Sequence, residues 1–309
     1  MKPSEFRRPR ALRAGSRVAL VAPAGPVAAE RIEAALHRCR SMDLEPVLSP
    51  NAGERHRFLA GPDDARLGDL QAAFDDPTID AIWALRGGYG TVRLLAKLDL
   101  RRQRKAPIPY IGFSDNTTIH ALHVALGVVS FHGPHPGADF PPETEASFVR
   151  TLFRAEPAGR IETRPSDPAP RPLVGGRAEG ALVGGNLSLV ASLCGTPDAL
   201  DARERILFLE DVGEPAYRVD RMLHQLERAG VTRGVRALAF GRFNDAPDEE
   251  QHPVADALRE FAERLRVPTV HDLPFGHVEH NVTLPVGVEA RLDADTATLE
   301  ILEPAVTEE

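Results

Sequence analysis

The fold is decided by the segment PYIGFSDNTT, which runs from Pro109 to Thr118. Apolar residues lead into Gly112, Ser114 follows two positions later, and a helix-forming sequence starts at Thr117. This order predicts a strand, a sharp turn and a helix, with a hydroxyl at the corner beside helical amides. The segment departs from the hydrolase motif G-x-S-x-G, because Asn116 stands where the second glycine would be. Ser114 is therefore a candidate nucleophile, and the segment leaves open the alternative that it is a helix N-cap.

The composition is that of an ordinary soluble globular protein. The chain has 309 residues, 42% of them hydrophobic and 27% charged, and this length suggests about two domains. A net charge of −8 gives no basic footprint, so we expect no nucleic-acid partner. The two cysteines, Cys39 and Cys194, form neither a metal spacing nor a disulfide framework. No apolar run has the length of a membrane span, and the basic N-terminus lacks the apolar segment of a secretory signal. We therefore expect a cytoplasmic protein without a membrane partner.

In the first half of the chain, short apolar runs alternate with helical patterns. Such alternation predicts a parallel sheet with right-handed crossovers. The expected strands are 17–23, 45–48, 79–85, 110–113 and 128–131, and the expected helices are 30–42, 63–74, 91–98 and one that starts at 117.

The pattern changes after a proline-rich stretch. Residues 165–172 contain four prolines in eight positions, which is typical of a linker. Beyond it we expect helices at 186–193, 217–229 and 254–265 and strands at 205–210, 235–240, 282–286 and 297–302. We predict an N-terminal α/β domain at 1–164, a linker at 165–175 and a smaller C-terminal domain of mixed α/β structure at 176–309.

A glycine-rich turn, Arg86-Gly87-Gly88-Tyr89-Gly90, directly follows an expected buried strand. A phosphate cradle is disfavoured, because the turn matches neither G-x-G-x-x-G nor a Gly-Lys-Ser/Thr motif. The turn could instead place backbone amides opposite Ser114, since glycine lets backbone approach closely. A tight turn with no further role is the other alternative.

Two acidic residues, Glu210 and Asp211, end an apolar strand. A carboxylate at such a position could orient a histidine, which is the third role in a serine triad. Alternatively, Asp211 or Glu214 begins the following turn and helix.

The eleven histidines supply many candidate bases. His277 and His280 lie in a loop punctuated by glycine and proline, where a side chain can be placed freely, whereas His132 and His135 follow a strand. No H-E-x-x-H spacing occurs, so we expect no metal site. For any single histidine, a structural hydrogen-bonded role is the alternative.

Six short motifs, in order, resemble the LD-carboxypeptidase family of serine peptidases, which also includes the microcin C immunity peptidases. The resemblance covers about residues 17–292. The motifs are at 85–90, 112–117, 131–134, 184–187, 209–214, and 276–277 followed by 284–287.

The resemblance implies a Ser-Glu-His triad and no cofactor. Ser114 matches the family's nucleophile, Glu210 the orienting acid and His277 the base, while the amides of Gly88 and Asp115 match its oxyanion hole. It also implies a flavodoxin-like N-terminal domain with a parallel sheet, a smaller mixed α/β C-terminal domain, and a homodimer.

The function implied is hydrolysis of the L,D-amide bond before a terminal D-amino acid in a cytoplasmic muropeptide (a tetrapeptide), as part of peptidoglycan recycling. The substrate's carboxylate suits a bidentate arginine. Arg86 beside the glycine turn is the candidate, with a surface ion pair as the alternative. Asn186, in the fourth motif, is the second candidate for binding substrate.

Two alternatives remain: hydrolysis of a peptidyl-nucleotide toxin, as in the immunity peptidases, and a non-catalytic protein that binds a small ligand. The immunity peptidases resemble one another in an aromatic residue that grips a nucleobase. Here Trp83 is expected in the core, and Phe140 and Phe148 lie within the segment 137–172, which matches no motif. This favours peptidoglycan turnover. His135 stands where the family often has an apolar residue, which would alter one wall of the pocket.

Overall fold

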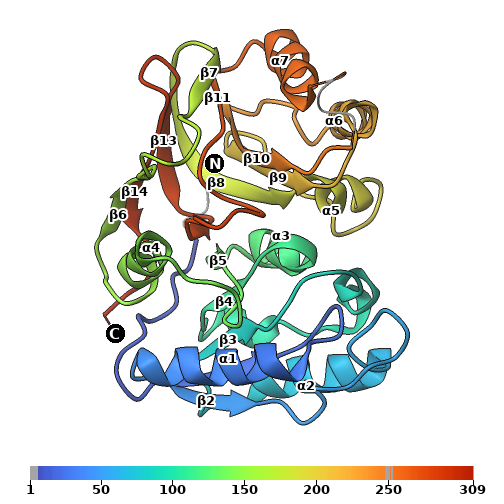
Figure 1. Cartoon of the computed structure of the whole chain (residues 1–309), viewed down its shortest axis with the longest axis vertical. Helices are drawn as coiled ribbons and strands as arrows, with labels where there is room; N and C mark the ends of the chain where they lie inside the picture. The colour runs from blue at the N-terminus through green and yellow to red at the C-terminus, as the bar shows by residue number, and fades with distance from the viewer. Residues whose placement is uncertain (1–5, 248–250, 252, 309) are drawn as a thin grey trace.

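The computed structural model describes residues 6–247, 251 and 253–308 and contains two β-sheets with helices packed around them. Figure 1 shows the two sheets one above the other, with the N-terminal half below and most of the C-terminal half above. The mixed α/β class expected from the sequence is confirmed.

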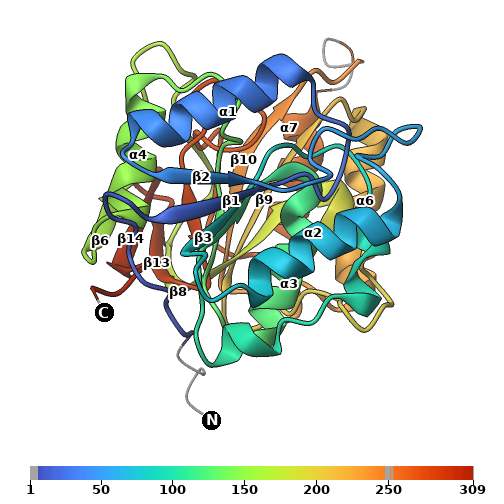
Figure 2. The same ribbon diagram turned by 90° about the horizontal axis from the view of Figure 1, so that it is seen from below.

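The first sheet has the strand order β12-β5-β4-β3-β1-β2. Its first five strands along the chain are mutually parallel and follow the flavodoxin-like order 2-1-3-4-5. Figure 2 shows α1 on one side of this sheet and α2 and α3 on the other. The elements are β1 (Arg17–Val21), α1 (Ala29–Ser41), β2 (Glu45–Leu48), α2 (Asp63–Asp75), β3 (Ala81–Ala84), β4 (Tyr110–Gly112), α3 (Thr117–Leu126), β5 (Ser130–His132) and β12 (Leu284–Val286). In such a sheet, ligands bind beyond the carboxyl ends of the strands.

The second sheet has the order β6-β14-β13-β8-β9-β10-β11-β7. Strands β8 to β11 are parallel, whereas the outer pairs are antiparallel. The strands are β6 (Pro157–Arg160), β7 (Arg171–Val174), β8 (Arg177–Asn186), β9 (Ile206–Val212), β10 (Ala237–Asn244), β11 (Thr269–His271), β13 (Glu289–Asp293) and β14 (Thr298–Pro304), with helices α4 (Pro142–Leu152), α5 (Leu187–Ser192), α6 (Ala216–Ala229) and α7 (Val254–Leu265).

Each sheet contains strands from both sides of the predicted domain boundary. Strand β6, before residue 164, pairs with β14, and β7, within the expected linker, pairs with β11. In the other direction, β12 from the C-terminal part pairs with β5 in the first sheet. The division at 164 and 176 stays a prediction about domains, but each sheet takes strands from both sides of it.

The prediction of a helix at 91–98 was wrong. The structure has two short 3₁₀ turns there, Thr91–Arg93 and Leu95–Lys97. The cause lies outside the segment, because the Thr91 amide donates to the buried Asp115 carboxylate at 2.8 Å. This long-range hydrogen bond fixes the start of the segment after Gly90, whose φ is +136°, and local helix propensity is overridden.

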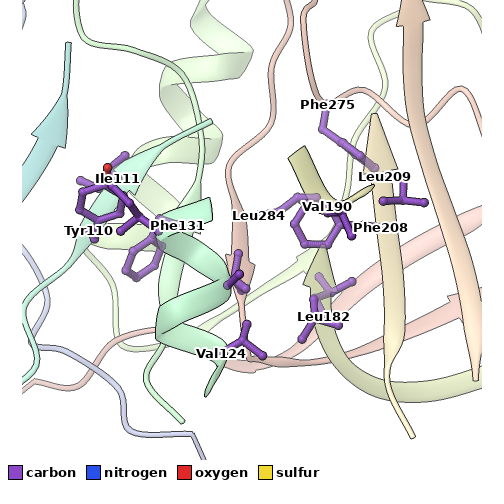
Figure 3. Close-up of a cluster of buried hydrophobic side chains, with 14 of the residues drawn as sticks. Tyr110, Ile111, Val124, Phe131, Leu182, Val190, Phe208, Leu209, Phe275 and Leu284 are labelled. Atoms are coloured by element: carbon purple, nitrogen blue, oxygen red, sulfur yellow. The ribbon is translucent and has the colours of Figure 1, made fainter. Parts of the chain in front are cut away.

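A continuous apolar core joins the two halves. Figure 3 shows Tyr110, Ile111 and Phe131 facing Phe208 and Leu182 of the second sheet. Residues in a close-packed core hold their neighbours in one arrangement. The core therefore fixes the ends of β4 and β9 relative to each other.

Trp83 lies in the core, as the sequence predicted. It is fully buried, stacks on Phe148 with 4.5 Å between ring centroids, and donates to the Pro134 carbonyl at 2.8 Å.

Candidate active site

Ser114 occupies the sharp corner between β4 and α3. Its φ of +61° lies in the left-handed region, which costs a non-glycine residue free energy and is found at functional sites. A Cβ on Gly87 would be 2.7 Å from Ser114 Cβ and 2.9 Å from its Oγ. The corner thus requires glycine in the facing turn. The N-cap position of the following 3₁₀ helix is Phe113, so the N-cap alternative for Ser114 is wrong.

His277 links Ser114 to Glu210. Its Nε2 lies 3.1 Å from Ser114 Oγ, and its Nδ1 lies 2.7 Å from Glu210 Oε2. Glu210 is fully buried near the end of β9, whereas the His277 side chain is 23% exposed. The three side chains come from the turn after β4, from β9 and from a loop, and they form one continuous relay whose middle member, His277, is partly exposed.

A second glycine, Gly276, lets the loop that carries His277 approach β9 closely. Gly276 has a φ of +103°, and a Cβ there would be 2.7 Å from Glu210 Oε2. Two side-chain amides hold this loop, since Asn281 Oδ1 accepts from the Gly276 amide at 3.1 Å and Asn244 Nδ2 donates to the His277 carbonyl at 2.8 Å. The backbone on both sides of the His277 side chain is therefore held in place.

The electrostatics of the pair favour an ionised acid. Burial raises the pKa of Glu210, but the imidazoles of His132 and His277 outweigh it and bring the pKa down to about 2. Burial lowers the pKa of His277, but its hydrogen bond with Glu210 and the Glu210 charge raise the pKa overall. A carboxylate accepts the Nδ1 proton, which leaves the His277 Nε2 lone pair for the serine hydroxyl.

The glycine turn and Asp115 flank the serine. The Asp115 amide nitrogen lies 3.3 Å from the position of a Cβ on Gly87, and Gly88 has a φ of +110°. The Asp115 carboxylate faces away and accepts from Thr91. The Thr91 hydroxyl also donates to the Asp115 carbonyl oxygen at 2.6 Å, so Thr91 holds both the backbone and the side chain of Asp115.

The two expected substrate-binding residues differ in their surroundings. Arg86 is exposed and donates to the Pro26 carbonyl at 2.8 Å, and within the described ranges it forms no ion pair. Asn186 is only 3% exposed, its Nδ2 donates to Asp211 Oδ1 at 3.0 Å, and its Oδ1 caps α5 through the Leu189 amide. Because both polar groups of Asn186 are engaged, its placement gives no support to a role in binding substrate.

The remaining candidates have other partners. Asp211 accepts from the Ser188 amide at 2.9 Å and thereby supports the start of α5. His280 is buried and its Nδ1 lies 2.8 Å from Asp167 Oδ2. His135 lies 3.0 Å from the Ala84 carbonyl oxygen, so neither of these histidines belongs to the relay.

Sequence reasoning did not assign a role to His132, which the structure brings next to the relay. It is fully buried at the end of β5, with Nε2 3.8 Å from Glu210 Oε1. The available signal was its position at a strand end, one strand from Ser114.

Within 6–247, 251 and 253–308, no group of three or more His, Cys, Asp or Glu side chains is arranged to hold a metal ion. Nor does any helix in these ranges combine the length and the apolar character that a membrane crossing requires.

The N-terminal and C-terminal domain models of the LD-carboxypeptidase family match residues 18–133 and 179–292. A putative carboxypeptidase of Streptomyces coelicolor is 44% identical, over 98% of each chain. The murein tetrapeptide carboxypeptidase of Pseudomonas aeruginosa is 38% identical, over 90% of this chain and 94% of the other. The chain therefore belongs to the LD-carboxypeptidase family of peptidases.

Solved structures agree with this family assignment. The muramoyltetrapeptide carboxypeptidase of Oxalobacter formigenes superposes with a TM-score of 0.81 at 32% identity, over 94% of this chain and all of the other. An MccF-like protein of Bacillus anthracis superposes with a TM-score of 0.86 at 25% identity, over 96% of this chain and 99% of the other. The fold is thus shared by both branches of the family.

Proposed function

We propose that the protein is a serine LD-carboxypeptidase, which releases the terminal D-amino acid from a muropeptide tetrapeptide. The observation that carries this proposal is the continuous relay Ser114–His277–Glu210, with distances of 3.1 and 2.7 Å. Such an arrangement activates a hydroxyl as a nucleophile. The names of the relatives from P. aeruginosa and O. formigenes support the substrate class.

In the first step, Ser114 Oγ attacks the carbonyl carbon of the L-centred residue, and its proton passes to His277 Nε2. The amides of Gly88 and Asp115 donate to the developing oxyanion. As the C–N bond breaks, His277 returns the proton to the leaving amine of the D-amino acid. Glu210 stays ionised and stabilises the imidazolium.

In the second step, water attacks the acyl ester on Ser114. His277 accepts a proton from this water and returns it to Ser114 Oγ as the ester C–Oγ bond breaks, so the shortened peptide leaves with a new terminal carboxylate and the enzyme is restored. No cofactor takes part in either step.

Arg86 binds the carboxylate of the terminal residue in this proposal. Its exposure and its lack of an ion pair within the described part of the chain support the role, because a guanidinium with no carboxylate partner is available for one in the substrate. Placing the carboxylate fixes the orientation in which the D-residue enters.

We place the enzyme in the cytoplasm, where it would act in peptidoglycan recycling, and we infer a homodimer from the family. The alternative of a peptidyl-nucleotide substrate rests on the MccF-like neighbours. It receives less support, because Trp83 and Phe148 are fully buried and the half-buried Phe140 packs against Trp83 and under the Arg38 guanidinium.

The test is mass spectrometry of a muropeptide tetrapeptide and a peptidyl nucleotide after incubation with the protein, with the Ser114→Ala variant as the control. We expect loss of the terminal D-residue from the tetrapeptide only. An active-site-directed serine probe separates an enzyme from a non-catalytic binder, since covalent labelling of Ser114 requires an activated hydroxyl. Cleavage of the nucleotide substrate alone would transfer the protein to the other branch of the family.

A further inference from the structure

His132 and Glu210 present unpaired polar atoms to each other inside the protein. Both side chains are fully buried, and His132 Nε2 lies 3.8 Å from Glu210 Oε1. Neither that oxygen nor either ring nitrogen of His132 has a hydrogen-bond partner among the described residues. Buried polar atoms are almost always hydrogen-bonded in native proteins. A movement of about 1 Å would bring this pair within hydrogen-bond distance.

The surroundings of His132 offer it no better partner. Three phenylalanine rings pack around it, with centroids 5.8 Å (Phe113), 5.3 Å (Phe208) and 6.4 Å (Phe275) away. A neighbouring histidine, His120, lies 6.2 Å away between ring centroids and has both ring nitrogens within 3 Å of other oxygens, those of Ser130 and Gly112. The Glu210 carboxylate is therefore the acceptor that remains for His132.

We propose that His132 is a positioning residue for Glu210, with its Nε2–H donating to Oε1 while the Nδ1–H of His277 donates to Oε2. Each carboxylate oxygen then has its own donor, so the carboxylate plane is fixed and the His277 ring is fixed with it. The effect of His132 on catalysis rests on the proposed function. Its effect on the protonation of the relay can be measured in the folded protein without any substrate.

The proposal has a consequence for the pH at which the relay becomes protonated. The relay needs an ionised Glu210 and a neutral His277, so one further proton inactivates it. That proton goes to His277, whose pKa the Glu210 carboxylate raises. A donor from His132 takes up part of the negative charge of Glu210, so the carboxylate attracts the His277 imidazolium less strongly and the proton is taken up at lower pH. The titratable groups that face His132 are Glu210 from β9, His120 from α3 and His135 from the loop after β5. Glu210 is the only acid among them.

Two variants separate a hydrogen-bond role from a packing role. His132→Gln retains a side-chain amide that reaches the place of Nε2, whereas His132→Leu fills the space without a donor. We expect the acid limb of the kcat/KM profile to move to higher pH by about one unit in the leucine variant. The limb should stay near that of the wild type in the glutamine variant.

The same shift should occur in the free protein, where the His277 imidazole is followed by NMR during a pH titration. That readout needs no substrate, so it tests the proposal even if the protein hydrolyses no tetrapeptide. If the leucine variant does not fold, as judged by thermal unfolding, His132→Asn replaces it, because its shorter amide does not reach Glu210. An unchanged titration in the donor-free variant would overturn the proposal, as would equal shifts in that variant and in His132→Gln.

Discussion

Gly87 and Ser114 are packed so closely that a single added methyl group on Gly87 would lie 2.9 Å from the serine Oγ. The φ of Gly87 lies outside the left-handed region, so alanine can adopt its backbone conformation, and the cost of the substitution arises from displacing the serine. We predict that Gly87→Ala lowers kcat/KM by about 100-fold or more, because small misplacements of catalytic groups have effects of that size. Steady-state kinetics measure this.

The matched control for that variant is Gly68→Ala. Gly68 is exposed within α2, and a Cβ there would have no neighbour within 4 Å. This control should keep wild-type kinetics and gain about 0.5–1 kcal/mol in the free energy of unfolding, since alanine replaces a helical glycine. Equal activity in the two variants would show that close packing against Ser114 is not required.

Replacing the nucleophile should separate activity from stability. We predict that Ser114→Ala lowers kcat by roughly 10⁴-fold or more, since triad residues act as a unit. The thermal midpoint should change little, because the left-handed backbone suits alanine no worse than serine. Substantial turnover by the purified variant, prepared free of wild-type enzyme, would remove Ser114 from the mechanism.

The two histidines of one loop should have opposite phenotypes. His277→Ala removes the base and should resemble Ser114→Ala in its kinetics. In His280→Ala, Asp167 loses its hydrogen bond with His280 but retains its ion pair with Arg164 at 3.0 Å. We therefore expect a loss of about 1 kcal/mol in the free energy of unfolding, with little change in kcat. Kinetics combined with urea denaturation distinguish the two, and the reverse ranking would contradict the assigned base.

Acid should stop catalysis before it removes the stability that Glu210 provides. The hydrogen bond with Glu210 raises the pKa of His277 above its usual 6.5, so kcat/KM should fall as the pH drops through the neutral range. The lowered pKa of Glu210, about 2 against 4.5, contributes stability that is complete above pH 4.5 and is lost as the pH falls towards 2.

The measurement is the pH dependence of kcat/KM and of the free energy of unfolding, in the wild type and in Glu210→Gln. Between pH 7 and pH 5 the stability advantage of the wild type over Glu210→Gln should not fall, because Glu210 stays ionised, and it should rise as His277 takes up a proton, while wild-type activity falls. A stability difference that stays unchanged as the pH falls from 4.5 towards 2 would mean that Glu210 has an ordinary pKa.

Stereochemistry is the sharpest test of substrate class. We predict release of D-alanine from an L,D-linked tetrapeptide and no release of L-alanine from the L,L isomer, measured by amino-acid analysis of the products. Arg86→Gln should raise KM about tenfold or more by removing a bidentate contact. Arg40→Gln is the control, because Arg40 is an exposed cation in the last turn of α1. Equal rates on the two diastereomers would exclude the L,D assignment.

Local sequence was sufficient for the corner at Ser114 and for the strand that carries Glu210, because each combines an apolar run with a turn signal a few residues long. It was insufficient at Thr91, whose conformation depends on a carboxylate 24 residues away. His132 could not be assigned either, since its significance arises from a glutamate on another sheet. Residues 284–286 were expected to close the C-terminal part of the chain, but they join the first sheet beside β5, a pairing that no local pattern specifies.

That last pairing determines when the nucleophile's sheet is complete. Until Leu284, Pro285 and Val286 have left the ribosome, β5 is an exposed edge strand. Glu210 and His277, the acid and the base, are also synthesised only after the first 200 residues. A growing chain, or a fragment cut near residue 164, therefore carries a serine with no partner to activate it and a sheet open to pairing with other chains. Contacts so distant in sequence make folding slow, and hydrolytic activity becomes possible only once residues 277 and 284–286 have been synthesised.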